Sequence, residues 1–494
     1  MEQGKNKKLF NSEKDSAEAG SIFLFETQAL AEQDPLSIFH KIKELGKPCF
    51  FFQKNQEIES GLRVSQTVLG FDEFERMTCK AGSVKIEGEG NPCEISGNPF
   101  EVISQRLQKY QVVNQPGLPD FQMGAFGYFT YESVRYNEPI LNQALGSFQI
   151  LKQNNNFVDA EFILFKKIII FDYLEKKIFL MSGFSDDDQS GLEFLKDLLK
   201  NSKSLLDIHV PQGELPPETF KSSLGKGRFI EGVKKLKEHI TAGDIFQAVL
   251  SERFEADLSI KPFDVFRRLL QTSISVYEFY FFTGKRVFLG ASPELLLQVS
   301  GEDLETHPIA GTRPRGVNPQ EEKKLEKQLL ASVKENAEHL MLVDLARNDL
   351  GRISKPGTVR VPEQVKIKKF PSVMHLVSRV TGKKKQDISA LEALASCFPA
   401  GTLSGAPKVR AMQLLSEIEN EPRGFYGGAV ALASLTGDLD SCIAIRSMEI
   451  ENGHSTIQAG AGIVSDSNPE KEYQEILHKT KTLRRILFSG VKSS

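Results

Sequence analysis

The sequence contains few cysteines for its length, almost no net charge and no long uninterrupted apolar run. Its five cysteines are scattered over 494 residues without a Cys-x-x-Cys pair. This spacing argues against a zinc site and against a disulfide framework, and it is compatible with a reducing compartment. We therefore expect a cytoplasmic protein that does not depend on disulfides.

The charge balance also excludes whole classes of partner. A formal net charge of -3 results from 62 basic and 65 acidic residues, which gives no basis for a nucleic-acid or membrane-surface partner. The most apolar stretch, residues 165–181, is interrupted by charges such as Lys166 and Lys177, and the N-terminus has no apolar segment of the signal-peptide kind. We therefore expect no membrane-spanning segment.

The composition that remains, 40% apolar and 26% charged, is that of an ordinary globular protein, and the length favours two or three domains. We predict a disordered tail over 1–20, a β-rich N-terminal domain over 21–206, a proline-containing linker over 207–224, and a second domain over 225–494. The expected fold class is α+β, with large, mostly antiparallel sheets packed with helices.

Alternation and run length predict the individual elements. Strands are expected at 21–25, 48–53, 124–129, 168–171, 287–290, 359–365, 427–433 and 443–450, and helices at 36–45, 232–242 and 320–350.

Two predicted helices carry acidic residues with helical spacing. Glu335 and Glu338 are three residues apart on one of them, and Glu472, Glu475 and Lys479 share one face of the other. If the helices face each other, four carboxylates surround one point, and oxygen ligands of this kind suit magnesium. Two unrelated surface helices with internal ion pairs would leave the same pattern.

Glycine-rich segments add potential donors for an anion. Gly460 and Gly462 follow a predicted strand, where glycine lets backbone N–H groups approach a ligand closely. The segment 398–407 leads into a helix for which Ser404 is the expected N-cap. Neither segment meets a nucleotide-binding pattern.

His375 lies in an apolar run, where a core histidine is as natural as a catalyst, and Arg446 at the end of an apolar strand requires an acidic partner or a substrate carboxylate.

Read together, these segments resemble the chorismate-utilising enzymes, and within them the anthranilate synthase component I family. Eight ordered blocks carry the resemblance: GDIFQAVLSERF at 243–254, GASPELL at 290–296, PIAGTRPRG at 308–316, ENAEHLMLVDLARNDLGR at 335–352, FPSVMHLVSRVTG at 370–382, FPAGTLSGAPKVRAM at 398–412, RGFYGGAV at 423–430, and QAGAGIV at 458–464 with the acidic helix that follows. The N-terminal half matches chiefly at GAFGYFTYESVRY, residues 124–136.

The resemblance implies an N-terminal domain of regulatory type and a chorismate-binding catalytic domain. It also implies that Mg²⁺ is bound directly by Glu338 and Glu475, and largely through water by Glu335 and Glu472. The implied substrate contacts are Thr312, Tyr426, Arg446, Gly460, Gly462 and Lys479, with Thr402 lining the site.

For the chemistry, the resemblance implies Glu294 as the general acid that assists departure of the ring hydroxyl, and His375 as a participant in pyruvate elimination. Gln247 stands where water-adding relatives carry a lysine base, and Ala310 stands where relatives making 4-amino-4-deoxychorismate carry a nucleophilic lysine. Both positions favour an anthranilate synthase large subunit. A 2-amino-2-deoxyisochorismate synthase, an aminodeoxychorismate synthase component and a catalytically silent regulatory subunit are the alternatives.

The resemblance further implies a hetero-oligomer in which a separate glutamine amidotransferase subunit supplies ammonia. It also suggests weak inhibition by tryptophan, because residues 50–54 and 273–278 differ from the family's tryptophan-binding elements.

Overall fold

The computed structural model describes residues 23–487, except 31–32, 59–60, 111, 113–116, 120, 152–153, 155–156, 185–186, 203–204, 206–207, 211–216 and 371–372. The predicted tail over 1–20 and much of the predicted linker therefore lie outside the described residues. The ladders between the described strands are antiparallel, as the sequence predicts. The expected α+β class is confirmed, because helices pack on these large sheets.

Two series of strands share the long strands β3 and β7. The first series runs in the order β1 (Phe23–Ala29), β8 (Lys177–Gly183), β7 (Val158–Asp172), β3 (Gly61–Lys80), β2 (Cys49–Ile58), β11 (Tyr277–Phe282), β12 (Arg286–Ser292), β21 (Ser447–Glu451), β22 (His454–Ile463) and β10 (Gln247–Asp257). The short strands β9 (Lys221–Ser222) and β18 (Gly405–Ala406) also pair with β10.

The second series leaves β3 and β7 in the other direction. It contains β5 (Cys93–Ser96), β4 (Ser83–Gly88), β6 (Gly124–Phe129), β19 (Ala429–Ser434), β20 (Leu439–Ile443), β13 (Leu295–Ser300), β14 (Asp303–Thr306), β17 (Val373–Lys383), β15 (Ile309–Pro314) and β16 (Arg360–Lys369). The ladders β2–β11 and β6–β19 connect the N-terminal half to the second half. The predicted domain boundaries remain a prediction.

The phenylalanine run in β2 shows why this sheet is buried on both faces. Phe50 stacks on Phe126 of β6 at a ring distance of 4.4 Å, inside the core shared by the two series. Phe51 points the other way and contacts Phe266 of α6 (Pro262–Thr272) at 5.3 Å. Successive strand residues alternate between faces, so an unbroken apolar run fits a strand covered on both sides.

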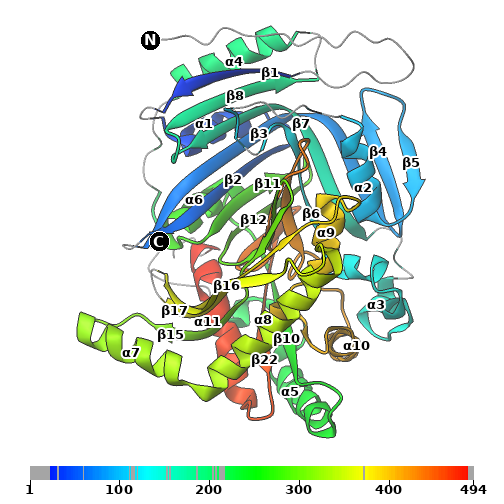
Figure 1. Ribbon diagram of the computed structural model, residues 1–494, viewed down its shortest axis with the longest axis vertical. Coiled ribbons are helices and arrows are strands. Elements are labelled where there is room, and N and C mark those ends of the chain that lie inside the picture. The colour runs from blue at the N-terminus through cyan, green and yellow to red at the C-terminus, as the bar shows by residue number, and fades with distance from the viewer. Residues whose placement is uncertain are drawn as a thin grey trace.

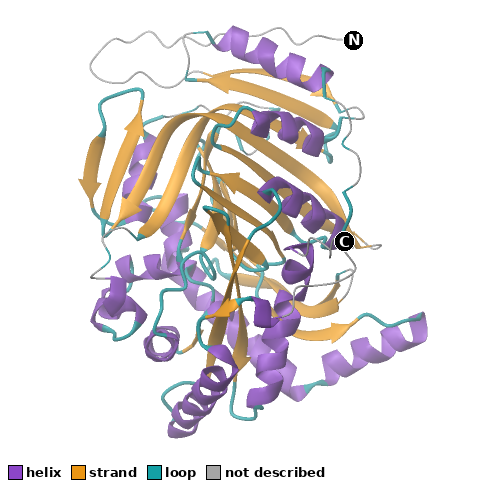
Figure 2. Cartoon of the chain, turned by 180° about the vertical axis from the view of Figure 1, so that it is seen from behind, coloured by secondary structure: helices purple, strands orange, loops and turns teal. Residues whose placement is uncertain are grey.

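Helices cover the outer face of the first series and gather at one end of the molecule (Figures 1 and 2). They are α1 (Pro35–Glu44), α2 (Pro99–Gln108), α3 (Ser147–Leu151), α4 (Asp188–Lys200), α5 (Gly225–Ala242), α6, α7 (Pro319–Ala331), α8 (Val333–Ile353), α9 (Ala390–Cys397), α10 (Lys408–Glu419) and α11 (Pro469–Leu487), with the 3-10 turns η1 (Tyr131–Tyr136), η2 (Pro139–Gln143), η3 (Pro217–Thr219) and η4 (Gly401–Leu403). Among the described residues, no helix is long and apolar enough to cross a membrane.

Three predicted elements differ from the structure. The single helix expected over 320–350 is two helices, because Ser332 ends α7 and caps α8, accepting a hydrogen bond from the N–H of Glu335 at 3.3 Å. Ser404 is not an N-cap: its hydroxyl donates to the carbonyl of Ala400 at 3.0 Å, and pairing of β18 with β10 delays the start of α10 until Lys408.

The strand expected over 443–450 is also wrong, because it breaks between β20 and β21. Arg446 adopts a left-handed backbone conformation with φ 51°, which few residues other than glycine adopt. Its carbonyl accepts a hydrogen bond from the N–H of Ala291 at 3.1 Å. This turn carries the chain from the second series of strands into the first, and it places Arg446 where the two series meet.

Candidate functional site

The two predicted acidic helices meet. Helix α8 begins near the segment that precedes α11, and Lys334 joins the two through an ion pair of 3.0 Å with Asp466. Both helices run through the lower half of the molecule in Figure 1. Asn468 caps α11 by accepting hydrogen bonds from the N–H groups of Glu470 and Lys471, both at 3.1 Å. The helix that carries Glu472, Glu475 and Lys479 therefore begins directly after Asn468.

The carboxylates of the two helices interact electrostatically. Burial and the negative charges of Glu335, Asp466 and Glu472 raise the pKa of Glu338, while Lys334 acts in the opposite direction. Burial and the charge of Glu475 likewise raise the pKa of Glu472. Like charges held at close quarters disfavour ionisation, and a bound cation would relieve that cost.

Each remaining acid of the set has a cation beside it. Glu335 accepts a hydrogen bond from Arg313 at 3.0 Å, and Glu475 pairs with Lys479 at 2.6 Å. Among the described residues, no group of three or more His, Cys, Asp or Glu side chains lies close enough to hold a metal ion. Carboxylate oxygens are donors that suit Mg²⁺. The four acidic side chains would have to reorient to surround one ion.

Lys479 connects the acidic helix to the glycine-rich end of β22. Its ammonium donates to the carbonyl of Gly460 at 2.7 Å, and its own carbonyl accepts a hydrogen bond from Arg446. The side chain of Arg446 is exposed to solvent, but many protein atoms lie around its guanidinium group. The resulting loss of hydration lowers its pKa. Two cations thus lie close together, Lys479 on α11 and Arg446 in the turn that contacts this helix.

The register of β22 orients the backbone of Gly460 and Gly462. Gly460 is opposite Ser251 of β10, and Gly462 is opposite Val249. The N–H groups of these two β10 residues point away from β22: that of Ser251 donates to Glu419, and that of Val249 donates to the carbonyl of Ser404. In an antiparallel ladder such pairs exchange no hydrogen bonds. The N–H groups of both glycines therefore point away from β10, on the side where Lys479 contacts Gly460.

Side chains are excluded at both glycines. A Cβ at position 460 would lie 2.7 Å from the hydroxyl of Tyr426, and one at position 462 would lie 2.9 Å from the amide nitrogen of Gln247. Tyr426 and Gln247 are thereby brought against the same strand end. The side-chain oxygen of Gln247 is buried without a hydrogen-bond partner, so an acceptor is available there for a donor on a ligand.

Glu294 lies between β12 and β13 and is buried, with 7% of its surface exposed. Burial raises its pKa to about 8, although the hydroxyl of Thr402, which donates to Oε1 at 2.9 Å, and the charge of Lys479 act in the opposite direction. The carboxyl is consequently protonated at neutral pH. Because Thr402 occupies Oε1, the proton is available on Oε2.

His375 lies on β17, opposite Thr312 of β15. Its Nδ1 is 2.9 Å from the carbonyl of Gly311 and 3.1 Å from the hydroxyl of Thr312. Burial and the charges of Arg446 and Lys479 lower its pKa, so the imidazole is neutral at pH 7. A carbonyl can only accept, so the proton sits on Nδ1 and the lone pair of Nε2 is available.

The structure therefore brings all the predicted site residues into one connected group. Lys479 acts electrostatically on Glu294, His375 and Glu472, pairs with Glu475, and contacts Gly460 and Arg446. Thr402 bonds Glu294, Thr312 bonds His375, and Tyr426 lies against Gly460. Glu338 interacts with Glu472, Glu335 interacts with Glu338, and Gln247 lies against Gly462. Arg313, which pairs with Glu335, is not among the residues predicted from the sequence, although it belongs to the block at 308–316. The spacing of residues in the sequence does not indicate that Arg313 contacts the acidic helix.

Comparison with known proteins places this architecture. Residues 47–485 match the family described as chorismate binding enzyme. The anthranilate synthase component 1 of Acetivibrio thermocellus is 36% identical over 471 residues, covering 92% of this chain and 93% of that protein. That of Aquifex aeolicus is 37% identical, covering 93% and 94%.

Solved structures show the same fold. The anthranilate synthase component I of Streptococcus pneumoniae superposes with a TM-score of 0.74 at 32% identity, over 87% of this chain and 93% of that one. The menaquinone-specific isochorismate synthase of Escherichia coli gives a TM-score of 0.71 at 18% identity, over 95% and 96%, and so shares the fold. The chain belongs to the chorismate binding enzyme family.

Proposed function

We propose that this chain is the large subunit of an anthranilate synthase, which converts chorismate and ammonia to anthranilate and pyruvate. The observation that carries the proposal is that a buried carboxyl, Glu294, whose pKa burial raises, and an imidazole, His375, whose pKa burial lowers, both lie within electrostatic reach of Lys479. The reaction needs an acid for one leaving group and a base for one ring proton. The names of the relatives support the same reaction.

Chorismate is a dianion, and the site offers cations and oriented amides for it. We assign one carboxylate to Arg446 with the Tyr426 hydroxyl, and the other to the N–H groups of Gly460 and Gly462. Charge-assisted hydrogen bonds of this kind fix orientation as well as affinity. Lys479 lies between these groups and adds a positive charge.

The metal in this proposal is Mg²⁺, held directly by Glu338 and Glu475 and through water by Glu335 and Glu472. When bound, it would neutralise a substrate carboxylate and the surrounding acids. Burial and the like charges of neighbouring acids raise the pKa values of Glu338 and Glu472, which supports this assignment.

The residues of the chain handle the protons. As ammonia adds at ring carbon 2, the hydroxyl at carbon 4 leaves with the proton of Glu294, and the product of this step is water. Nε2 of His375 then accepts the proton of carbon 2, the bond between the ring and the enolpyruvyl oxygen breaks, and enolpyruvate leaves as the ring becomes aromatic. The enolpyruvate becomes pyruvate by taking up one proton, and His375 returns to its neutral form by releasing the proton it accepted.

Gln247 and Ala310 support ammonia as the nucleophile. A neutral amide is a poor base for water, and alanine can form no covalent adduct. We propose that ammonia comes from a separate glutamine amidotransferase subunit, because none of the five cysteines lies in a GxCxG nucleophile segment. All five are free thiols, and four of them are buried, which supports the proposed cytoplasmic location.

Turnover by the isolated chain tests this assignment. With chorismate, Mg²⁺ and an ammonium salt, we expect anthranilate and pyruvate in equal amounts, and with glutamine in place of ammonium we expect no product. Mass spectrometry separates the alternatives, since a 2-amino-2-deoxyisochorismate synthase would release an aminated product that keeps the enolpyruvyl group. Turnover with glutamine would contradict the need for a partner, and no turnover with ammonium would contradict the enzyme itself.

A further inference from the structure

The N-terminal motif at 124–136 touches the proposed substrate site, although no role follows for it from the reaction. After β6 the motif continues into η1, which lies beside the loop 423–428 that carries Tyr426. The loop packs closely against the motif: a Cβ at Gly428 would lie 2.1 Å from the carbonyl of Phe129, and one at Gly427 would lie 3.1 Å from the ring of Tyr131.

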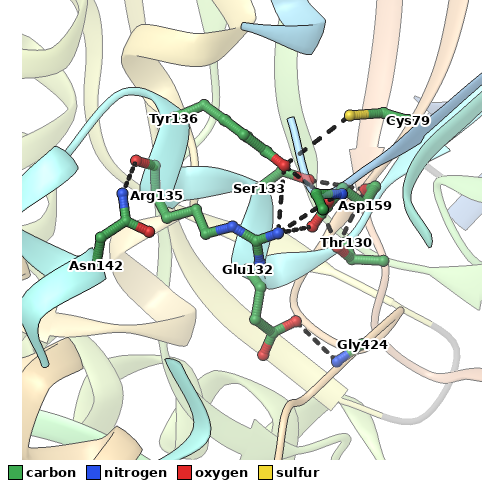
Figure 3. A network of polar contacts seen from close by, with 10 residues as sticks. Cys79, Thr130, Glu132, Ser133, Arg135, Tyr136, Asn142, Asp159 and Gly424 are labelled. Carbon is green, nitrogen blue, oxygen red and sulfur yellow. Dashed lines mark hydrogen bonds and ion pairs between the residues drawn. The ribbon is translucent and has the colours of Figure 1, made fainter. Parts of the chain in front are cut away.

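Glu132 of η1 holds the start of this loop. It is 1% exposed, and its two carboxylate oxygens accept hydrogen bonds from the N–H groups of Arg423 at 2.6 Å and Gly424 at 3.0 Å. In return, the N–H of Tyr131 donates to the carbonyl of Gly424 at 2.9 Å. Figure 3 shows the carboxylate of Glu132 directed at Gly424.

The same η1 turn is anchored on its other side. Arg135 pairs with the fully buried Asp159 of β7 at 2.8 Å, and the hydroxyl of Tyr136 donates to Asp159 at 2.7 Å. The hydroxyls of Thr130 and Ser133 donate to the carbonyl of Asp159 at 3.0 and 2.7 Å (Figure 3). Glu132 therefore projects from a rigid base.

The side chain of Arg423 extends the connection from the loop to two other parts of the site. It donates to the carbonyl of Leu403 in η4 at 2.7 Å and to the carbonyl of Val249 in β10 at 2.6 Å. η4 carries Thr402, which bonds Glu294, and β10 carries Gln247. Arg423 is 4% exposed and also pairs with Glu419 at 2.7 Å.

We propose that Glu132 is a positioning residue for the substrate site: by fixing the backbone of Arg423 and Gly424, it sets the loop that carries Tyr426 relative to the segments of Thr402 and Gln247. The N-terminal half thus adds a support at the start of the loop, whereas the catalytic half holds its other end through the hydrogen bond from the N–H of Gly427 to the carbonyl of Ala444 at 2.9 Å. The inference rests on the proposed function for its kinetic consequence, whereas its structural consequence does not depend on the substrate.

Glu132→Gln is the informative substitution, because the amide retains one acceptor and turns its NH₂ group toward the other N–H. We expect amide hydrogen exchange in the loop 423–428 to become at least about tenfold faster, since one lost hydrogen bond to a charged group corresponds to a factor of this order or more. We also expect the KM for chorismate to rise by a similar factor with a smaller change in kcat.

Glu75→Gln is the matched control. Glu75 is a second buried carboxylate of the N-terminal half, but it pairs with Arg106 and Tyr110 and does not touch the loop. This variant should leave loop exchange and KM unchanged. If Glu132→Gln does not fold, Glu132→Asp, which keeps the charge but shortens the side chain, should show the same two effects.

Unchanged loop exchange in a folded Glu132 variant would overturn the proposal, and so would faster exchange with an unaltered KM. Absence of chorismate turnover by the wild-type chain would refute the proposed function instead, and the exchange result would then still decide whether Glu132 holds the loop.

Discussion

The carboxylates that contact Arg423, which form the buried support of the loop 423–428, have different surroundings from the carboxylates of helices α8 and α11. Glu132 and Glu419 are buried, and hydrogen bonds from Arg423, Gly424 and Ser251 occupy their oxygens. Glu338 and Glu472 are only partly buried, and burial together with the like charges beside them raises their pKa values. A satisfied network specifies geometry, whereas unrelieved repulsion in an accessible place indicates a site that a ligand completes.

The largest effect should come from Glu294→Gln, which removes the proton but keeps an acceptor for Thr402. General acid catalysis contributes about 10²–10⁴-fold, so kcat should fall by that factor. In the wild type, kcat should fall as pH rises through about 8, where the carboxyl loses its proton. Steady-state kinetics across this pH range measures both effects.

The same variant should be more stable than the wild type at pH 7. The folded pKa is raised above the unfolded value, so stability is lost as pH rises from the unfolded pKa toward about 8, and glutamine cannot titrate. Glu449→Gln is the control for the effect on kcat. Burial also raises the pKa of Glu449, but this carboxyl lies outside the site, so kcat should not change. Full activity of Glu294→Gln would remove Glu294 from the mechanism.

Breaking the buried contacts of Arg423 should lower the free energy of unfolding. Arg423→Met leaves Glu419 buried without its partner, which typically costs about 3–5 kcal/mol of stability. Arg347→Met removes an exposed ion pair with Asp344 and should change stability by less than about 0.5 kcal/mol. Urea unfolding of both variants measures the difference, and equal stabilities would contradict the distinction between support and site.

A smaller effect on total turnover, but a change of product, is expected for His375→Met. Methionine cannot accept the proton of carbon 2, so amination should continue while anthranilate output falls by about 10²-fold. Mass spectrometry should then detect the aminated intermediate that still bears the enolpyruvyl group. Anthranilate formation at the wild-type rate would exclude His375 from the elimination step.

The smallest effect expected is that of tryptophan. The two elements that differ from the family pattern lie side by side, since β2 pairs with β11. Lys54 pairs with Asp440 at 2.5 Å, the hydroxyl of Tyr277 donates to Asp440 at 2.7 Å, and Asn55 donates to Glu278. These groups bond one another, although the buried side-chain oxygen of Asn55 has no hydrogen-bond partner among the described residues. A zwitterion would have to displace these bonds. Inhibition by micromolar tryptophan would contradict this expectation.

Most residues of the candidate site could be proposed from the sequence. They lie in contiguous blocks that either have helical spacing or resemble the blocks of the family. The strand and helix periodicities also locate most elements. The exceptions are local: Ser332 divides one long helical pattern, and Arg446 bends an apolar run that reads as one strand. Both depend on capping and backbone geometry that tertiary contacts decide.

The contribution of Glu132 was not predictable in the same way. Its partners, Arg423 and Gly424, are about 290 residues away and are bound through backbone N–H groups, which no sequence pattern marks. The precise separation of the four acidic side chains was equally out of reach, because rotamers and neighbouring cations such as Arg313 and Lys479 determine it.

Metal titration tests the central claim most directly. Mn²⁺, an EPR-active substitute for Mg²⁺, should bind the wild-type chain at one site per chain in the presence of chorismate. Glu338→Gln, on α8, and Glu475→Gln, on α11, should each weaken that binding on the order of 100-fold, because a single ion connects the two helices. Binding that survives either substitution unchanged would show that the two helices do not share a metal, and the account would fail.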